Sequence, residues 1–102
     1  MGLLDILFGK KTNSIETYLD NDAIVLDVRT QKEFDAFHFE NVVHIPISEL
    51  KSRVNEVKQR NKPVIAHCKS GVRSARAVSI LKANGIDAIN GGGLPAMQNV
   101  LQ

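Results

Sequence analysis

The sequence contains a single cysteine, Cys68, and this scarcity excludes several kinds of protein at once. One cysteine cannot form an internal disulfide and cannot build a cysteine-rich structural zinc site. The histidines are few and widely spaced, so we expect no metal site, and we expect no other cofactor. A lone thiol suits a reducing compartment, where it stays available for reaction, and we therefore expect a cytoplasmic protein.

The sequence also lacks a strong excess of charge, internal repeats and low-complexity stretches. Its 102 residues fit one domain, and a hydrophobic content of 43% is ordinary for a globular protein. The formal net charge of +2 is too small to indicate a nucleic-acid partner. We expect a monomer that binds neither nucleic acid nor a membrane.

The N-terminal segment, residues 1–11, is apolar but lacks the features of a secretory signal. No basic residue precedes its apolar stretch, Asp5 interrupts that stretch, and no small-residue cleavage site follows. We expect this segment to pack on the domain formed by residues 12–102. A weak contact with a membrane or a partner is the alternative.

Apolar runs alternate with amphipathic stretches along the rest of the chain. The runs expected to form strands cover residues 23–28, 42–45, 64–67 and 86–90. The expected helices cover about residues 31–37, a stretch that begins at Ser48, a stretch from Gly71 or Ser74 to Asn84, and a stretch opened by Pro95. This alternation predicts an α/β fold, with a central parallel sheet of about four to five strands and helices on both faces.

Several of these elements carry local signals at their ends. Thr30 and Glu33 have the spacing of a capping box at a helix start. Ser48 is expected to cap the helix that begins there. Gly85 is expected to follow the C-terminal end of the helix that ends at Asn84. The three glycines at 91–93 should let the backbone pass close to the loop after Cys68.

Cys68 stands where an apolar run ends and a loop with glycine and two cations begins. A thiol at the tip of a buried strand faces the next helix, whose dipole and free N–H groups favour an anion. Lys69 and Arg73 should favour the thiolate as well. The alternative is an inert core cysteine. Because two cations and a glycine directly after a strand would serve poorly as core packing, we interpret Cys68 as a nucleophile.

The spacing within the loop limits which reactions Cys68 is expected to carry out. Only the residues from Lys69 to Val72 separate Cys68 from Arg73. Cysteine-dependent phosphatases have one residue more between the same two groups, and their loop wraps a tetrahedral phosphate. A tighter loop should hold one extra sulfur atom better than a phosphate. The spacing therefore favours a persulfide on Cys68 and opposes a phosphatase or an arsenate reductase.

Three ordered motifs resemble those of a known family. The stretch 68–74 matches the pattern Cys-x-x-Gly-x-Arg-Ser, and the stretch 92–97 resembles a closing Gly-Gly-x-x-Ala-Trp segment, with Met97 in place of the aromatic residue. Upstream, the matching residues are Asp27-Val28-Arg29, Glu33-Phe34, His38 and Ile45-Pro46. On these motifs, which extend over roughly residues 12–102, the chain resembles the single-domain members of the rhodanese-like sulfurtransferases.

The resemblance implies a small rhodanese-like fold and a sulfurtransferase. Such an enzyme moves sulfane sulfur from thiosulfate, or another small anionic donor, to a thiophilic acceptor through a persulfide on Cys68. The residues implied to bind the substrate are Lys69, Ser70, Gly71, Val72, Arg73 and Ser74. The acceptor must be external, either a thiol or a protein partner, because the chain has no second cysteine to resolve the persulfide.

Polar residues near the nucleophile are expected to support it rather than react. Asp27 and Arg29 fall at the same sheet edge as Cys68. Asp27 could brace the loop by accepting hydrogen bonds, or the two residues could form a local ion pair worth about 0–1 kcal/mol if exposed. His67 should point to the opposite face of its strand from Cys68, and we interpret it as structural.

The main alternative function belongs to another class of protein. The same loop could serve a non-catalytic sulfur carrier, or a redox-sensing module that binds a partner protein. Steady-state turnover with thiosulfate separates an enzyme from either of these.

The loop spacing leads to a direct comparison of two reactions. We expect the unaltered chain to accept sulfur from thiosulfate and to show negligible hydrolysis of para-nitrophenyl phosphate, because its loop is too tight for a phosphate. Both reactions can be followed on one preparation, by detection of Cys68 persulfide and by release of nitrophenol. Robust phosphatase turnover without a detectable persulfide would show that the spacing argument is wrong.

Overall fold

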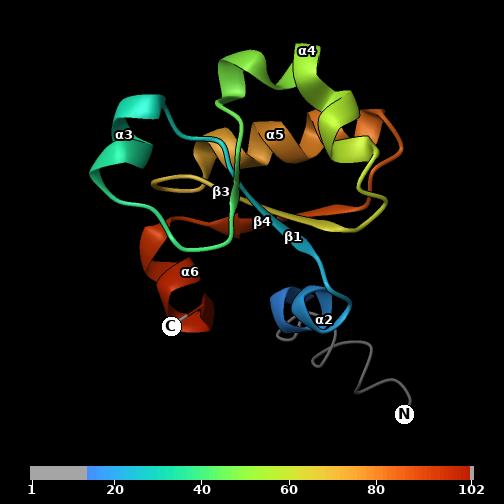
Figure 1. The fold of residues 1–102 in the computed structure, drawn as a ribbon. Helices are drawn as coiled ribbons and strands as arrows, with labels where there is room; N and C mark the ends of the chain where they lie inside the picture. The colour runs from blue at the N-terminus through green and yellow to red at the C-terminus, as the bar shows by residue number, and fades with distance from the viewer. Residues whose placement is uncertain (1–13, 102) are drawn as a thin grey trace.

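The computed structural model describes residues 14–101 and consists of alternating helices and strands (Figure 1). In chain order the elements are α2 (Ser14–Asp20), β1 (Ile24–Asp27), α3 (Gln31–Ala36), β2 (Val43–His44), α4 (Ile47–Lys58), β3 (Val64–His67), α5 (Val72–Ala83), β4 (Ala88–Gly92) and α6 (Leu94–Leu101). The segment 1–11, which we expect to pack on the domain, lies outside the described residues.

The strands form one four-stranded sheet in the order β2-β1-β3-β4, and every neighbouring pair is parallel. All four residues of β1 and of β3 are buried, as expected for central strands covered on both faces. The predicted α/β class and parallel sheet are therefore confirmed, with the strand number at the lower end of the expected range.

Helices cover both faces of the sheet, as predicted (Figure 1). On one face, α4 and α5 bury residues such as Leu50, Val57 and Leu81 against the sheet. On the other face, Met97 of α6 packs with Val25 and Ile65, and α2 adds partly buried apolar residues. Each layer removes one side of the sheet from water, which is the main source of stability for this architecture.

Two of the predicted helix ends are confirmed. Thr30 caps α3 with a full capping box, in which its side chain accepts from the Glu33 N–H and Glu33 reaches back to the Thr30 N–H. α5 ends at Ala83, Asn84 is its C-cap residue, and Gly85 follows with a positive φ of 77°. Glycine adopts that conformation without the steric cost that a side chain would bring.

Several boundaries differ from the prediction, most by one or two residues, and three of them are described here. Ser48 does not cap α4, which begins one residue earlier, because the Ile47 N–H donates to the Val28 carbonyl over 3.0 Å and needs no capping side chain. β4 starts at Ala88 rather than at residue 86, because the Ile86 N–H still bonds the Leu81 carbonyl at the end of α5. α6 begins at Leu94, one residue before Pro95.

One element, α2, was not expected from the sequence at all. It is only 7 residues long, and helices of that length depend on packing rather than on their own propensity. Ile15, Tyr18 and Leu19 pack it against the cluster that contains Phe39 and Met97. Among residues 14–101, no helix combines the length and the apolar character needed to cross a bilayer.

The glycine-rich end of β4 approaches the loop after β3, as the three glycines predicted. The Cys68 N–H donates to the Gly92 carbonyl over 3.1 Å, and the Leu94 N–H donates to the Lys69 carbonyl over 3.2 Å. A Cβ atom at Gly93 would lie 2.3 Å from that same Lys69 carbonyl oxygen. Only a residue without a side chain fits there, so the contact fixes the loop against the end of the sheet.

Candidate active site

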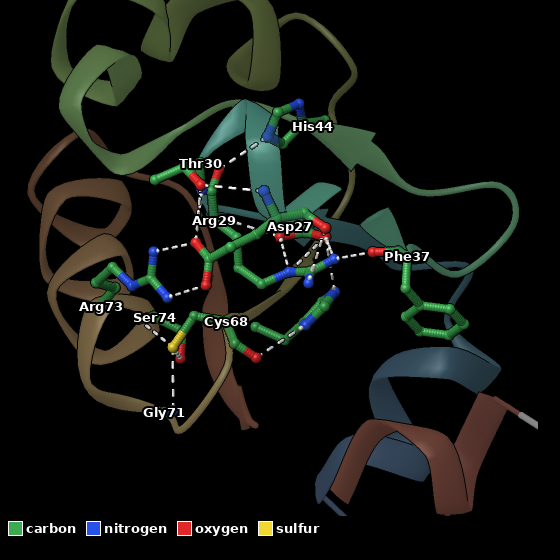
Figure 2. Close-up of polar contacts among 11 residues, drawn as sticks. Asp27, Arg29, Thr30, Phe37, His44, Cys68, Gly71, Arg73 and Ser74 are labelled. Carbon is green, nitrogen blue, oxygen red and sulfur yellow. Dashed lines mark hydrogen bonds and ion pairs between the residues drawn. The ribbon is translucent and has the colours of Figure 1, made fainter. Parts of the chain in front are cut away.

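Cys68 lies at the carboxyl edge of the sheet, directly after β3, and only 1% of the residue is exposed. Its sulfur faces the inside of the loop that leads into α5 (Figure 2). The Gly71 N–H donates to Sγ over 3.0 Å, the Ser74 N–H lies 3.4 Å from Sγ, and the Ser74 Oγ is also 3.4 Å away. The loop therefore surrounds the sulfur with hydrogen-bond donors.

This ring of donors determines the acidity of the thiol. Burial alone would raise the pKa of Cys68, because a thiolate loses solvation. Hydrogen bonds from the Ser74 side chain and from the N–H groups of Ser74, Gly71 and Ser70 outweigh burial and lower the pKa to about 7, from an ordinary value of 9.0. A substantial fraction of Cys68 is thus thiolate at neutral pH, which is the reactive form.

The Ser74 hydroxyl links the sulfur to a second polar side chain. It donates to Asn90 Oδ1 over 2.7 Å, and a hydroxyl has only one proton to donate. Its oxygen can therefore accept from the Cys68 thiol. To donate to the thiolate, the hydroxyl has to turn its proton from Asn90 to the sulfur, and Asn90 Oδ1 then keeps the Gly92 N–H at 2.9 Å. Ionisation exchanges one hydrogen bond of Ser74 for another.

Asn90 is a site residue that the sequence analysis missed. Besides accepting from Ser74 and Gly92, it donates through Nδ2 to the Gly71 carbonyl over 3.0 Å. One amide side chain on β4 therefore holds the loop at Gly71 and at Ser74, where α5 has begun. The available signal was an asparagine within a predicted strand, where this residue type is depleted.

Arg73 pairs with a carboxylate rather than with the Cys68 sulfur. Its guanidinium forms a two-pronged pair with Glu33, at 2.7 Å to Oε1 and 3.0 Å to Oε2 (Figure 2). In the described part of the chain, neither Arg73 nor Lys69 donates a hydrogen bond to the Cys68 sulfur. Hydrogen bonds from the loop, rather than these two cations, are the main cause of the lowered thiol pKa.

Glu33 is the second residue missed as part of the site, since its sequence context indicated only a capping box. The hydrogen bond from Arg73 lowers the pKa of Glu33 to about 2, and the contacts from Thr30 act in the same direction. Because the folded pKa is depressed, the pair contributes stability above the ordinary pKa of 4.5, and this contribution is lost only as pH falls toward 2. The Arg73 anchor therefore stays intact wherever the thiol titrates.

Asp27 and Arg29 form a buried ion pair, with exposed fractions of 0% and 3% and a shortest distance of 2.7 Å. Arg29 also donates to the Phe37 carbonyl over 2.6 Å, beyond the end of α3. The pair is thus neither an exposed local contact nor a direct brace of the loop. It holds the segment around α3, which carries Glu33, and removing one partner would leave an uncompensated buried charge.

His67 has the structural position that we predicted. It is fully buried, its ring packs edge-on against Phe39, and burial lowers its pKa, which favours the neutral form. Its Nε2 lies 3.7 Å from Asp27 Oδ2 without a hydrogen-bond partner, and its Nδ1 contacts the Cys68 carbonyl oxygen at 3.4 Å rather than the Cys68 sulfur. His67 is therefore not placed to act as a base for Cys68.

The remaining loop residues face outward. Lys69 and Ser70 are exposed, and Val72 has 75% of its surface exposed. Within residues 14–101, no three metal-binding side chains come together.

Comparison with protein families matches residues 12–98 to the Rhodanese-like domain. Among curated proteins, YqhL of Bacillus subtilis is 42% identical over 66% of this chain and 52% of its own length. The putative sulfur carrier protein YrkF of the same organism is 36% identical over 69% of this chain and 37% of its own length. The chain thus spans about half, or less, of the length of these curated relatives.

Among solved structures, a rhodanese-like domain protein from Staphylococcus aureus superposes with a TM-score of 0.66. It is 36% identical in sequence, and the match covers 72% of each chain.

The hydrogen bond from Ser74 can be tested through the acidity of the thiol. Ser74→Ala should shift the pH profile of Cys68 alkylation by iodoacetamide upward by about one to two pH units, because a hydrogen bond to a charged group contributes about 1.5–3 kcal/mol. Ser79→Ala removes an exposed hydroxyl from the same helix and should leave the profile centred near 7. Equal profiles for wild type and Ser74→Ala would contradict the assigned role.

Proposed function

The chain belongs to the rhodanese-like domain family, and from this premise we propose that it is a sulfurtransferase that works through a persulfide on Cys68. The finer part of the proposal is that thiosulfate, or a similar small anion, supplies the sulfur and that an external thiol or protein accepts it. The observation that carries the proposal is the convergence of Gly71 N–H, Ser74 N–H and the Ser74 hydroxyl on one buried sulfur.

The first half-reaction uses the thiolate as nucleophile. The Cys68 thiolate attacks the outer sulfur of thiosulfate and forms a new S–S bond. The S–S bond of thiosulfate breaks, and sulfite leaves with its electron pair. No oxidant is needed, because the sulfane sulfur passes between two nucleophiles without net electron loss.

The geometry of the loop supports this step in two ways. Its N–H groups can stabilise the negative charge on the thiolate and on the persulfide, as an oxyanion hole does for oxygen. The burial of Cys68 favours a slender donor, because very little of the residue is open to solvent. Lys69, exposed beside the loop, suits the attraction of an anion.

The second half-reaction returns the enzyme to its thiolate form. An acceptor thiolate attacks the outer sulfur of the persulfide, a bond forms between acceptor and sulfur, and the Cys68 thiolate leaves. Cys68 is the only cysteine of the sequence, so the attacking thiol must come from another molecule. The first step consumes the free thiolate enzyme and the second regenerates it, so the scheme predicts ping-pong kinetics.

A sulfur carrier is the second candidate, because one relative, YrkF, has the name of a putative sulfur carrier protein. A carrier would hold the same persulfide but would deliver it only to its own partner. Catalytic turnover between two small molecules separates the two functions, since a carrier would load sulfur once and stop.

Thiosulfate and cyanide provide that turnover assay. We expect steady release of thiocyanate with parallel double-reciprocal lines, and a rate with thiosulfate that increases with pH through about 7 as Cys68 ionises. Cys68→Ser should reduce the rate to the uncatalysed background while its circular dichroism spectrum stays that of the wild type. More than a trace of activity in Cys68→Ser would exclude this nucleophile, and one equivalent of loaded sulfur without turnover would indicate the carrier.

A further inference from the structure

We propose that the outer face of α5 and the facing end of α4 form a docking surface for a protein acceptor whose surface is acidic around an apolar side chain. The proposal rests on the proposed sulfur transfer and states what kind of partner receives the sulfur. We define the α4–α5 surface by six residues that line one cleft of about 400 Å³: Ile47, Ser48, Lys51, Arg76, Ser79 and Ile80.

The α4–α5 surface is continuous with the nucleophile loop. Val72 and Arg76 lie one helical turn apart on α5, about 6 Å along its axis, and so share a face. The residues that α5 buries, Ser74, Ala77 and Leu81, lie on the opposite side of the helix. A partner seated on this face therefore reaches from the cleft to the mouth of the loop.

α4 starts at the same edge of the sheet as the loop. The hydrogen bond from the Ile47 N–H to the Val28 carbonyl, over 3.0 Å, places the first turn of α4 just beyond the carboxyl end of β1. Figure 1 shows α4 and α5 side by side above the sheet. The cleft lies between the first half of α4 and the middle of α5, and thus starts near the site-bearing edge of the sheet.

The charged residues of the α4–α5 surface, Lys51 and Arg76, are both cations. In the described part of the chain, Lys51, Lys69 and Arg76 have no carboxylate within ion-pair distance, whereas Arg53 and Arg73 are paired with glutamates. The sequence has no acidic residue between Glu56 and Asp87, the stretch that carries β3, the loop and α5. These exposed cations create a positive potential that attracts an acidic surface.

Apolar contacts complement these cations. Val72 is 75% exposed at the start of α5, and Ile47 and Ile80 line the cleft. A centre of apolar side chains within a charged rim is the common anatomy of a transient protein interface. None of the six described residues that line the cleft is an aromatic on which bases could stack, so a single-stranded nucleic acid fits this surface less well.

Two peptides that each contain one cysteine test the proposal on the full chain. In the acidic peptide the cysteine is flanked by Glu and Leu, and in the neutral peptide each Glu is replaced by Gln. The protein is loaded with sulfur from thiosulfate, and its discharge to each peptide is timed. We expect discharge to the acidic peptide to be at least about tenfold faster at low salt, with the preference disappearing at high salt.

Charge reversals at the two ends of the same helices provide matched variants. The double variant Lys51→Glu, Arg76→Glu should lose or invert the peptide preference. The control, Lys58→Glu with Lys82→Glu, makes the same change in net charge at the C-terminal ends of α4 and α5 and should keep the preference. An unchanged preference in the first variant, or equal losses in both, would overturn the α4–α5 surface as the docking site.

Discharge to cyanide separates this proposal from the proposed function. All variants should release thiocyanate at rates within about twofold of the wild type, because cyanide is too small to need docking. If thiosulfate leaves no sulfur on Cys68, sulfur transfer is refuted. The surface is then tested by fluorescence anisotropy, with a rhodamine-labelled acidic peptide in which Ser replaces Cys. Tighter binding by the wild type and the control than by the Lys51→Glu, Arg76→Glu variant supports the surface. Equal binding by all three proteins, or no binding, overturns it.

Discussion

The convergence of loop N–H groups on the Cys68 sulfur is the interaction on which the rest of the site depends. A buried thiol without donors would have a raised pKa and would be an inert core residue. The loop that carries the donors is held at several places: Asn90 bonds Gly71 and Ser74, Gly93 allows the loop backbone to approach β4, and Gly71 takes a left-handed φ of 99° before α5. The chemistry of the cysteine thus depends on backbone placement more than on neighbouring charge.

A second set of contacts connects this loop to the interior of the domain. The buried Asp27–Arg29 pair fixes the segment around α3 through the Phe37 carbonyl. Glu33, in the first turn of α3, then holds Arg73 at the start of α5. Arg73 therefore serves as an anchor for the loop, and Lys69, which has no carboxylate partner among the described residues, stays available for an anion or a partner. This division explains why two cations so close in sequence have different surroundings.

The sequence predicted the features that depend on local patterns. The alternation of apolar runs with amphipathic stretches indicated the parallel sheet, and the Thr30–Glu33 spacing indicated the capping box, because both are set by neighbouring residues. The pair of Glu33 with Arg73 and the contacts of Asn90 join residues far apart in the chain, and local patterns do not reveal such pairs. The short helix α2 escaped prediction because its stability comes from the tertiary cluster that it covers.

The central claim is that this sulfur atom carries another sulfur, and the intact mass of the protein tests it most directly. The full chain is incubated with thiosulfate at neutral pH, where Cys68 is substantially ionised, and is then measured without reducing agent. The account predicts a gain of one sulfur atom that disappears on addition of cyanide and is absent in a sample alkylated beforehand at Cys68. An unchanged mass after thiosulfate, in a protein whose thiol still reacts with iodoacetamide, would contradict it.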